Sequence, residues 1–102
     1  MATVTSKTLF RGAATTTVGT TLYTVPSSTT AVVTNIIITN TAGAAGTFTL
    51  GLNGTNLATT VYVAANDSTV LDIKQPLTAT QTITGGASAT SINFHISGVE
   101  IA

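Results

Sequence analysis

The sequence predicts an all-β fold, an antiparallel β-sandwich of the jelly-roll kind with about eight short strands. Apolar and threonine residues recur with the period of two that marks a strand with one buried face. Groups of Gly, Asn, Asp, Ser and Pro interrupt these runs about every eight to twelve residues, which is typical of sandwiches and small barrels. No apolar stripe of helical period and useful length competes with the strands.

The strongest strand signal is the run Ala31–Thr39, in which Val and Ile occupy both alternating faces. A strand that is apolar on both faces is expected at the centre of a sheet, with a cover on each side. In a domain of 102 residues the opposite sheet supplies one cover. The second cover is expected from either an N-terminal arm or a neighbouring subunit.

Two extended segments precede this central strand. Residues 2–10 predict a first strand or an extended arm, which the small residues 12–14 interrupt. Residues 16–25 predict a second strand. Pro26 ends it, because proline cannot donate a hydrogen bond to a sheet.

A hairpin follows the central strand. Residues 47–52 alternate between apolar and small or polar residues, which predicts a strand with one buried face. Asn53-Gly54 is the strongest turn signal in the chain, since both residues tolerate positive φ. The return strand is expected over residues 55–57, with a further extended stretch at 60–64 and a turn at 65–68.

The second half of the chain predicts three more strands. Residues 69–73 form the first, which Gln75-Pro76 interrupts or ends. Residues 82–84 form a weak strand, and residues 86–89 a flexible turn. The last strand starts at Ile92 and carries the lone histidine, His95, on the face opposite its apolar residues.

The segments make up one domain over residues 1–102, in which residues 2–11 are an N-terminal arm or an edge strand. Gly98 is expected to break the final strand. No signal peptide or membrane-spanning run is recognised, so a soluble protein made in a cytoplasm is expected.

Charged residues are unusually few, at 6% of the chain and zero formal net charge, against about 25% in ordinary domains. They are Lys7, Arg11, Asp67, Asp72, Lys74 and Glu100. Three basic residues make no phosphate-binding cluster, so nucleic-acid binding is not expected. The low charge favours a subunit that buries much of its surface in an assembly over a threonine-coated monomer.

No catalytic or metal-binding constellation is recognisable, so the chain is not expected to be an enzyme or to hold a cofactor or metal. It has one histidine, no cysteine and no nucleophile-elbow motif. Asp67 is expected to bond its own turn, and Glu100 to pair with Lys7 or Arg11. Tyr23 and Tyr62 are expected in the core or an interface, with stacking on a sugar ring as the alternative.

Several short motifs follow one another from Leu22 onward. They are Tyr-x-Val-Pro at Tyr23, a long apolar strand ending at Asn40, Asn-Gly at Asn53, Asp-Ser leading to Leu-Asp at Leu71, and Ile-Ser-Gly-x-Glu-Ile at Ile96. In this order the motifs resemble those of short β-rich virion proteins of tailed bacteriophages. One departure is Thr80-Gln81, where a Gly-Asp turn is expected.

The resemblance implies a virion protein without enzymatic activity, and the leading hypothesis is a capsid cement (decoration) subunit. Such a subunit would bind junctions of the major capsid protein, as a homo-oligomer for which a trimer is one arrangement. The alternatives are a tail or fibre component that contacts the host, or a carbohydrate-binding module. Basic groups beside large apolar side chains can anchor an interface, so the expected interface residues are Lys7, Leu9, Phe10 and Arg11.

Overall fold

The structure is a computed structural model that describes residues 3–102. Its strands are β1 (Val4–Ala13), β2 (Thr21–Thr24), β3 (Thr30–Asn40), β4 (Gly46–Leu52), β5 (Thr55–Val63), β6 (Ser68–Leu77), β7 (Thr82–Ala87) and β8 (Ile92–Ile101). Met1 and Ala2, where the expected domain and its arm begin, lie outside the described residues.

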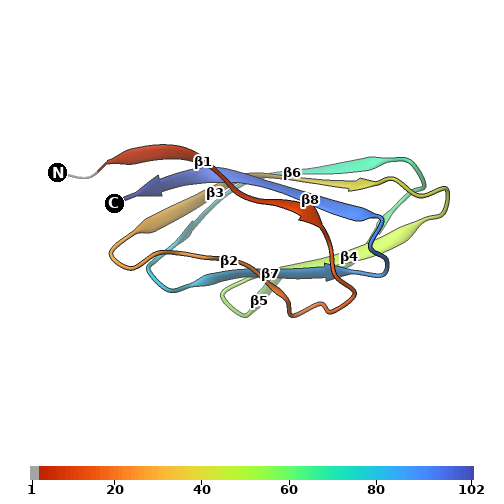
Figure 1. The fold of residues 1–102 in the computed structure, drawn as a ribbon, viewed down its shortest axis with the longest axis horizontal. Helices are drawn as coiled ribbons and strands as arrows, with labels where there is room; N and C mark the ends of the chain where they lie inside the picture. The colour runs from red at the N-terminus through yellow and green to blue at the C-terminus, as the bar shows by residue number, and fades with distance from the viewer. Residues whose placement is uncertain (1–2) are drawn as a thin grey trace.

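The strands form two antiparallel sheets that face each other as two layers (Figure 1). The first sheet has the order β1-β8-β3-β6, and the second has the order β2-β7-β4-β5. Successive strands alternate between the sheets, except that the β4–β5 hairpin stays within the second. This alternation is a jelly-roll arrangement, so the predicted fold class is confirmed. The described part of the chain contains no helix that could cross a membrane.

The central strand of the first sheet is β3, which lies between β8 and β6. Ala31 and Val33 are buried in its first half, and Ile36 and Ile38 in its second. The buried parity changes because the register shifts between Val33 and Asn35, so a bulge keeps both halves facing the core. The bulge explains much of the two-sided apolar pattern. The opposite face of β3 stays half-exposed, so residues 3–102 do not supply the expected second cover.

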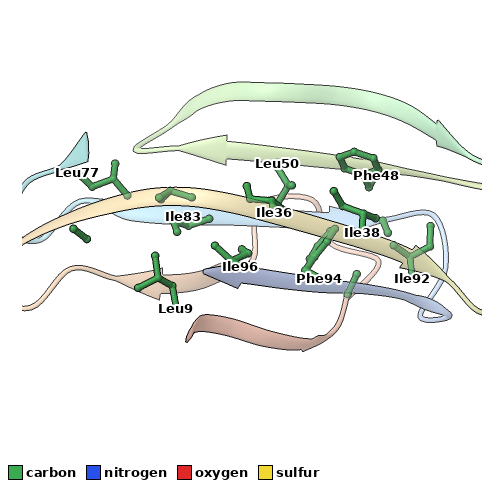
Figure 2. Packing of buried hydrophobic residues seen from close by; sticks show 14 of the residues in the cluster. Leu9, Ile36, Ile38, Phe48, Leu50, Leu77, Ile83, Ile92, Phe94 and Ile96 are labelled. Carbon is green, nitrogen blue, oxygen red and sulfur yellow. The ribbon is translucent and has the colours of Figure 1, made fainter. Parts of the chain in front are cut away.

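The core lies between the two sheets, where side chains from β3, β4, β7 and β8 meet (Figure 2). Phe48 on β4 and Phe94 on β8 pack edge to face, with ring centroids 6.2 Å apart and an interplanar angle of 73°. Such a pair contributes about 0.5–1.5 kcal/mol beyond the area that it buries. The aromatic pair therefore joins the two layers through the core.

The first two strands differ from their predicted bounds. β1 continues through Gly12, which pairs with Phe94 in the ladder, so the expected interruption is wrong. β2 begins only at Thr21, because the preceding residues form a turn. In that turn the hydroxyls of Thr15 and Thr20 donate to the Thr17 carbonyl over 3.1 and 2.7 Å. Local hydroxyl-to-backbone bonds of this kind compete with strand pairing.

Strands β5 and β6 are both longer than predicted. β5 is continuous, but Thr60 has a φ of 50° and the pairing with β4 is irregular there, which explains why the sequence indicates two short pieces. The Thr60 amide donates to Thr49 Oγ1 over 3.0 Å at this point. β6 runs through Pro76 to Leu77. An edge strand accommodates this proline because its missing N–H need not face a neighbour.

Two glycines expected to end or break strands lie inside them, because another backbone passes close by. A Cβ on Gly86 of β7 would lie 2.5 Å from the Thr17 carbonyl oxygen. A Cβ on Gly98 of β8 would clash with the Val32 carbonyl oxygen. The expected turn at residues 86–89 therefore starts too early, since β7 runs to Ala87, and the expected break at Gly98 is wrong.

Candidate functional site

The main candidate site is the side of the first sheet that points away from the second sheet, here called the outer face. Residues paired across an antiparallel ladder lie on the same face, and Phe94, Ile96, Ile36 and Ile38 are buried toward the core. The residues between them therefore point outward. The apolar members of the outer face are Val4, Val32, Ile37, Val70, Val99 and Ile101. Val4 and Val70 are 65% and 59% exposed.

Two opposite charges lie near the two edges of the outer face. Arg11 on β1 belongs to a cross-strand row that continues through His95 and Ile37 to Val70 on β6. The next outward position along β6 is Asp72. Both charged residues are exposed. The face therefore has an apolar and hydroxyl-rich centre, with the cation Arg11 at one edge and Asp72, followed by Lys74, at the other.

The four predicted interface residues are divided by the structure. All lie on β1, an edge strand paired with β8 (Figure 1). Leu9, at a bulge in that pairing, is only 7% exposed and belongs to the core, and Phe10 packs against it. Lys7 and Arg11 remain accessible. An interface role for the four residues stays a prediction. Of the four, Lys7 and Arg11 contribute most of the surface that a partner could contact.

A polar network links the sheets near one end of the sandwich. Lys7 Nζ lies 3.2 Å from Glu100 Oε1, which confirms one of the two ion pairs expected for Glu100. The Tyr23 hydroxyl on β2 donates to the other oxygen of the same carboxylate. Tyr23, helped by Lys7, holds the pKa of the Glu100 carboxyl below its ordinary value, although partial burial opposes this. Burial, the hydrogen bond and the charge of Glu100 raise the pKa of Tyr23.

A buried amide organises the loops that join the sheets at the end of β3. Asn40 Nδ2 donates to the Ala44 carbonyl over 2.8 Å, and its Oδ1 accepts from the Ala42 amide over 3.0 Å. Its backbone N–H donates to the Asp67 carbonyl over 2.8 Å. One side chain thus holds the β3–β4 loop, and its backbone holds the β5–β6 turn.

These loops border an open hollow of about 400 Å³. It is lined by Thr39, Asn40, Thr41, Asn66, Asp67 and Ser68. Asp67 Oδ1 accepts from the Ser68 amide over 2.8 Å, as expected for a residue that bonds its own turn. Across residues 3–102 no three His, Cys, Asp or Glu side chains gather as metal ligands would. The hollow therefore offers hydroxyls and amides but a single carboxylate.

The two tyrosines have different surroundings. Tyr23 is half-buried and hydrogen-bonded to Glu100, so its ring is not free to stack on a sugar. Tyr62 on β5 is 66% exposed, which excludes the core position and leaves the interface alternative as a prediction. It lies beside a hollow of about 210 Å³ whose lining includes Thr47 and Ser88. Of the two candidates for sugar stacking, the structure leaves Tyr62.

Sequence reasoning missed the outer face as a unit, the Tyr23–Glu100 link and the role of Asn40. The first two depend on which strands become neighbours, and these residues are far apart in the chain. Asn40 carried a usable signal, because a polar residue ending a long apolar strand often bonds a loop backbone.

Comparison by sequence identifies no relatives: no protein-family model and no curated protein matches the chain. Comparison by structure does find similar folds. The chain aligns with one in the acidic stable capsid of Helicobacter pylori bacteriophage KHP30, with a TM-score of 0.57 and 10% identity. That alignment covers 100% of this chain and 94% of the other.

A second alignment is with the IBDV viral particle, at a TM-score of 0.59 and 9% identity, covering 98% of this chain and 30% of the other. A third, weaker one is with the sugar-binding EclA C-terminal domain, at a TM-score of 0.46 and 17% identity, covering 100% and 79%. Identities this low show a shared jelly-roll fold and nothing further, and the third similarity is too loose to argue from.

Proposed function

We propose that this chain is a bacteriophage virion structural protein, a capsid cement subunit that binds across junctions of the major capsid protein and stabilises the head shell. The observation that carries the proposal is the uncovered outer face of a jelly roll with only six charged residues in 102. A surface of this kind is suited to close packing in an assembly.

The fold comparison supports the same proposal. Because the alignment with the phage KHP30 capsid covers 94% of that chain, a jelly roll of almost this size can make up nearly a whole chain in a phage capsid. The IBDV alignment, which covers 30% of its chain, is compatible with a jelly roll as part of a larger virion chain. The order of motifs from Leu22 onward points in the same direction.

The proposed mechanism is mechanical, without enzymatic activity. A subunit that binds the assembled shell but not its separated parts stabilises the shell by mass action. Contacts made by hydroxyl and apolar groups depend little on ionic strength. Major capsid protein is the proposed partner and the virion the proposed location, with no role for nucleic acid or membrane.

Adding purified protein to heads that lack it tests this function. We expect saturable binding and a higher temperature of DNA release, with little change in occupancy between about 0.05 and 0.5 M salt. Absence of binding to heads, together with binding to tails, would favour the tail or fibre alternative.

A carbohydrate-binding module is the second candidate, and Tyr62 is the observation in its favour. Its exposed ring lies beside the hydroxyls of Thr47 and Ser88, a combination that suits stacking and hydrogen bonding to a sugar. A glycan array distinguishes the candidates. Specific sugar binding that is lost in Tyr62→Ala, with no affinity for shells, would replace the cement proposal.

A further inference from the structure

The outer face is the largest regular surface of the chain that no other part of the described chain covers. β1 does not fold over it, because it lies beside β8 as an edge strand in the same sheet. Val32 and Ile37 of the central strand are consequently only half-buried. The described part of the chain therefore leaves this face open to a partner molecule.

The outer face is large enough for a stable interface. A sheet of four strands, each 10 or 11 residues long, projects roughly 600 Å² of area. A standard protein–protein interface buries about 800 Å² on each partner. The face is therefore close to the size that one partner molecule would occupy.

The charges of the outer face match a second copy of the same face. Arg11 lies on the β1 edge and Asp72 on the β6 edge, one outward position away from the Arg11 row. A two-fold axis parallel to the strands places β1 of each copy over β6 of the other. Outward positions along a strand are about 6.6 Å apart, which is within reach of an arginine side chain. Two symmetric Arg11–Asp72 pairs would then flank the apolar centre.

We propose that the free protein forms a two-fold dimer through its outer faces, with Arg11 of each copy paired to Asp72 of the other. His95 and Ile37 are neighbours in the Arg11 row and lie on the two central strands, β8 and β3. Across the axis, His95 of each copy faces Ile37 of the other. Lys74 is further along β6 than Asp72, away from the Arg11 row. The dimer does not depend on the cement proposal, because it concerns the protein in the absence of shells.

An axis perpendicular to the strands fits less well. It would place β1 over the second copy's β1, where Arg11 is the only charged side chain that points outward, because Lys7 pairs with Glu100 on the core side of the sheet. Arg11 would then face like charge or no charge. An Arg11–Asp72 pair therefore requires the axis parallel to the strands.

Sedimentation of the purified protein is the first test. We expect a monomer–dimer equilibrium with a mass approaching twice 10.2 kDa as the concentration rises. A monomer at about 100 µM, a concentration at which even weak specific dimers form, would overturn the proposal. If such a monomer still bound shells, and outer-face substitutions abolished that binding, the face would belong to the capsid protein instead.

Charge exchange tests the geometry of the dimer. Arg11→Asp and Asp72→Arg each place two like-charge contacts in the dimer, so each should raise the dimer Kd about tenfold or more. The double variant restores both pairs within its own dimer. An equimolar mixture of the two single variants restores both pairs in a mixed dimer, so both samples should dimerise as tightly as wild type.

Asp67→Arg is the matched control, because Asp67 is also an exposed aspartate but lies in the β5–β6 turn. It should leave the dimer Kd unchanged. Dimerisation that is insensitive to both single variants, or that the mixture fails to restore, would overturn the proposed pairing. Circular dichroism of each variant separates loss of dimer from loss of fold, and the mixture remains informative because both components must fold to restore it.

Discussion

The Glu100 carboxylate on β8 accepts a hydrogen bond from the Tyr23 hydroxyl on β2, across the gap between the two sheets. Lys7 on β1 pairs with the same carboxylate. The carboxylate side chain is mostly buried, whereas the lysine is 47% exposed. Glu100 therefore joins three strands near the end of the sandwich where the first and last strands pair.

This network predicts an acid limb in the stability curve. Since the folded-state pKa of Glu100 lies below its ordinary value of 4.5, its contribution to stability is present above pH 4.5 and is lost as the pH falls through the folded-state pKa. Urea denaturation at a series of pH values measures this limb. In Glu100→Gln the dependence below pH 4.5 should flatten, and an unchanged curve would contradict the assignment.

Tyr23 predicts an alkaline limb of the opposite sign. Its folded-state pKa is raised, so its contribution is present below its ordinary pKa of 10.0 and is lost as the pH rises toward the folded-state value. Tyr23→Phe should remove this limb while keeping the ring packed. Tyr62→Phe is the control, because that ring is exposed. An alkaline limb retained in Tyr23→Phe would assign it to another group.

Gly98→Ala should destabilise the protein by about 1–3 kcal/mol or more, because the added methyl group would meet the backbone of β3. Gly19→Ala is the matched control, since a Cβ at that position would meet no heavy atom within 4 Å beyond its chain neighbours. The control should be neutral or slightly stabilising. Equal effects of the two substitutions in urea denaturation would contradict the close approach of β8 to the Val32 carbonyl.

Phe94→Ala should cost about 3–5 kcal/mol, because it removes a fully buried ring and its edge-to-face partner contact. Phe94→Leu should cost less, since it keeps most of the apolar volume. Val18→Ala, at a position 47% exposed, should stay within about 0.5 kcal/mol of wild type. Thermal and urea denaturation measure all three, and a Phe94→Ala cost similar to that of Val18→Ala would be inconsistent with a core that includes this ring.

Asn40→Asp should destabilise the protein, although the two side chains have nearly the same size. The new carboxylate can still accept from the Ala42 amide, but it would point an oxygen at the Ala44 carbonyl instead of a donor. A buried polar group left without a hydrogen-bond partner lowers the free energy of unfolding by about 1–3 kcal/mol. Hydrogen exchange should report faster opening of residues 41–45. Protection equal to wild type would show that other contacts hold the loop.

The strand content and the central position of Ala31–Thr39 were predictable from sequence, because alternation and β-branched residues report strands directly. The roles of Gly86 and Gly98 were not, since a glycine that admits a neighbouring backbone looks like one that ends a strand. The continuation of β6 through Pro76 was not predictable either, because only the sheet order shows that β6 is an edge strand.

The candidate site was less predictable than the fold. Lys7 pairing with Glu100 could be guessed, because so few charges are present. The partnership of Glu100 with Tyr23 could not, because the two residues are 77 positions apart. The placement of Arg11 and Asp72 at opposite edges of one face likewise depends on the order β1-β8-β3-β6.

The proposed function makes this chain a component of a phage head shell. Mass spectrometry of purified particles, separated into heads and tails, tests it most directly. We predict peptides of this chain in the head fraction, in amounts that are a simple ratio to the major capsid protein. Peptides confined to the tail fraction, or their absence from intact particles, would contradict the claim.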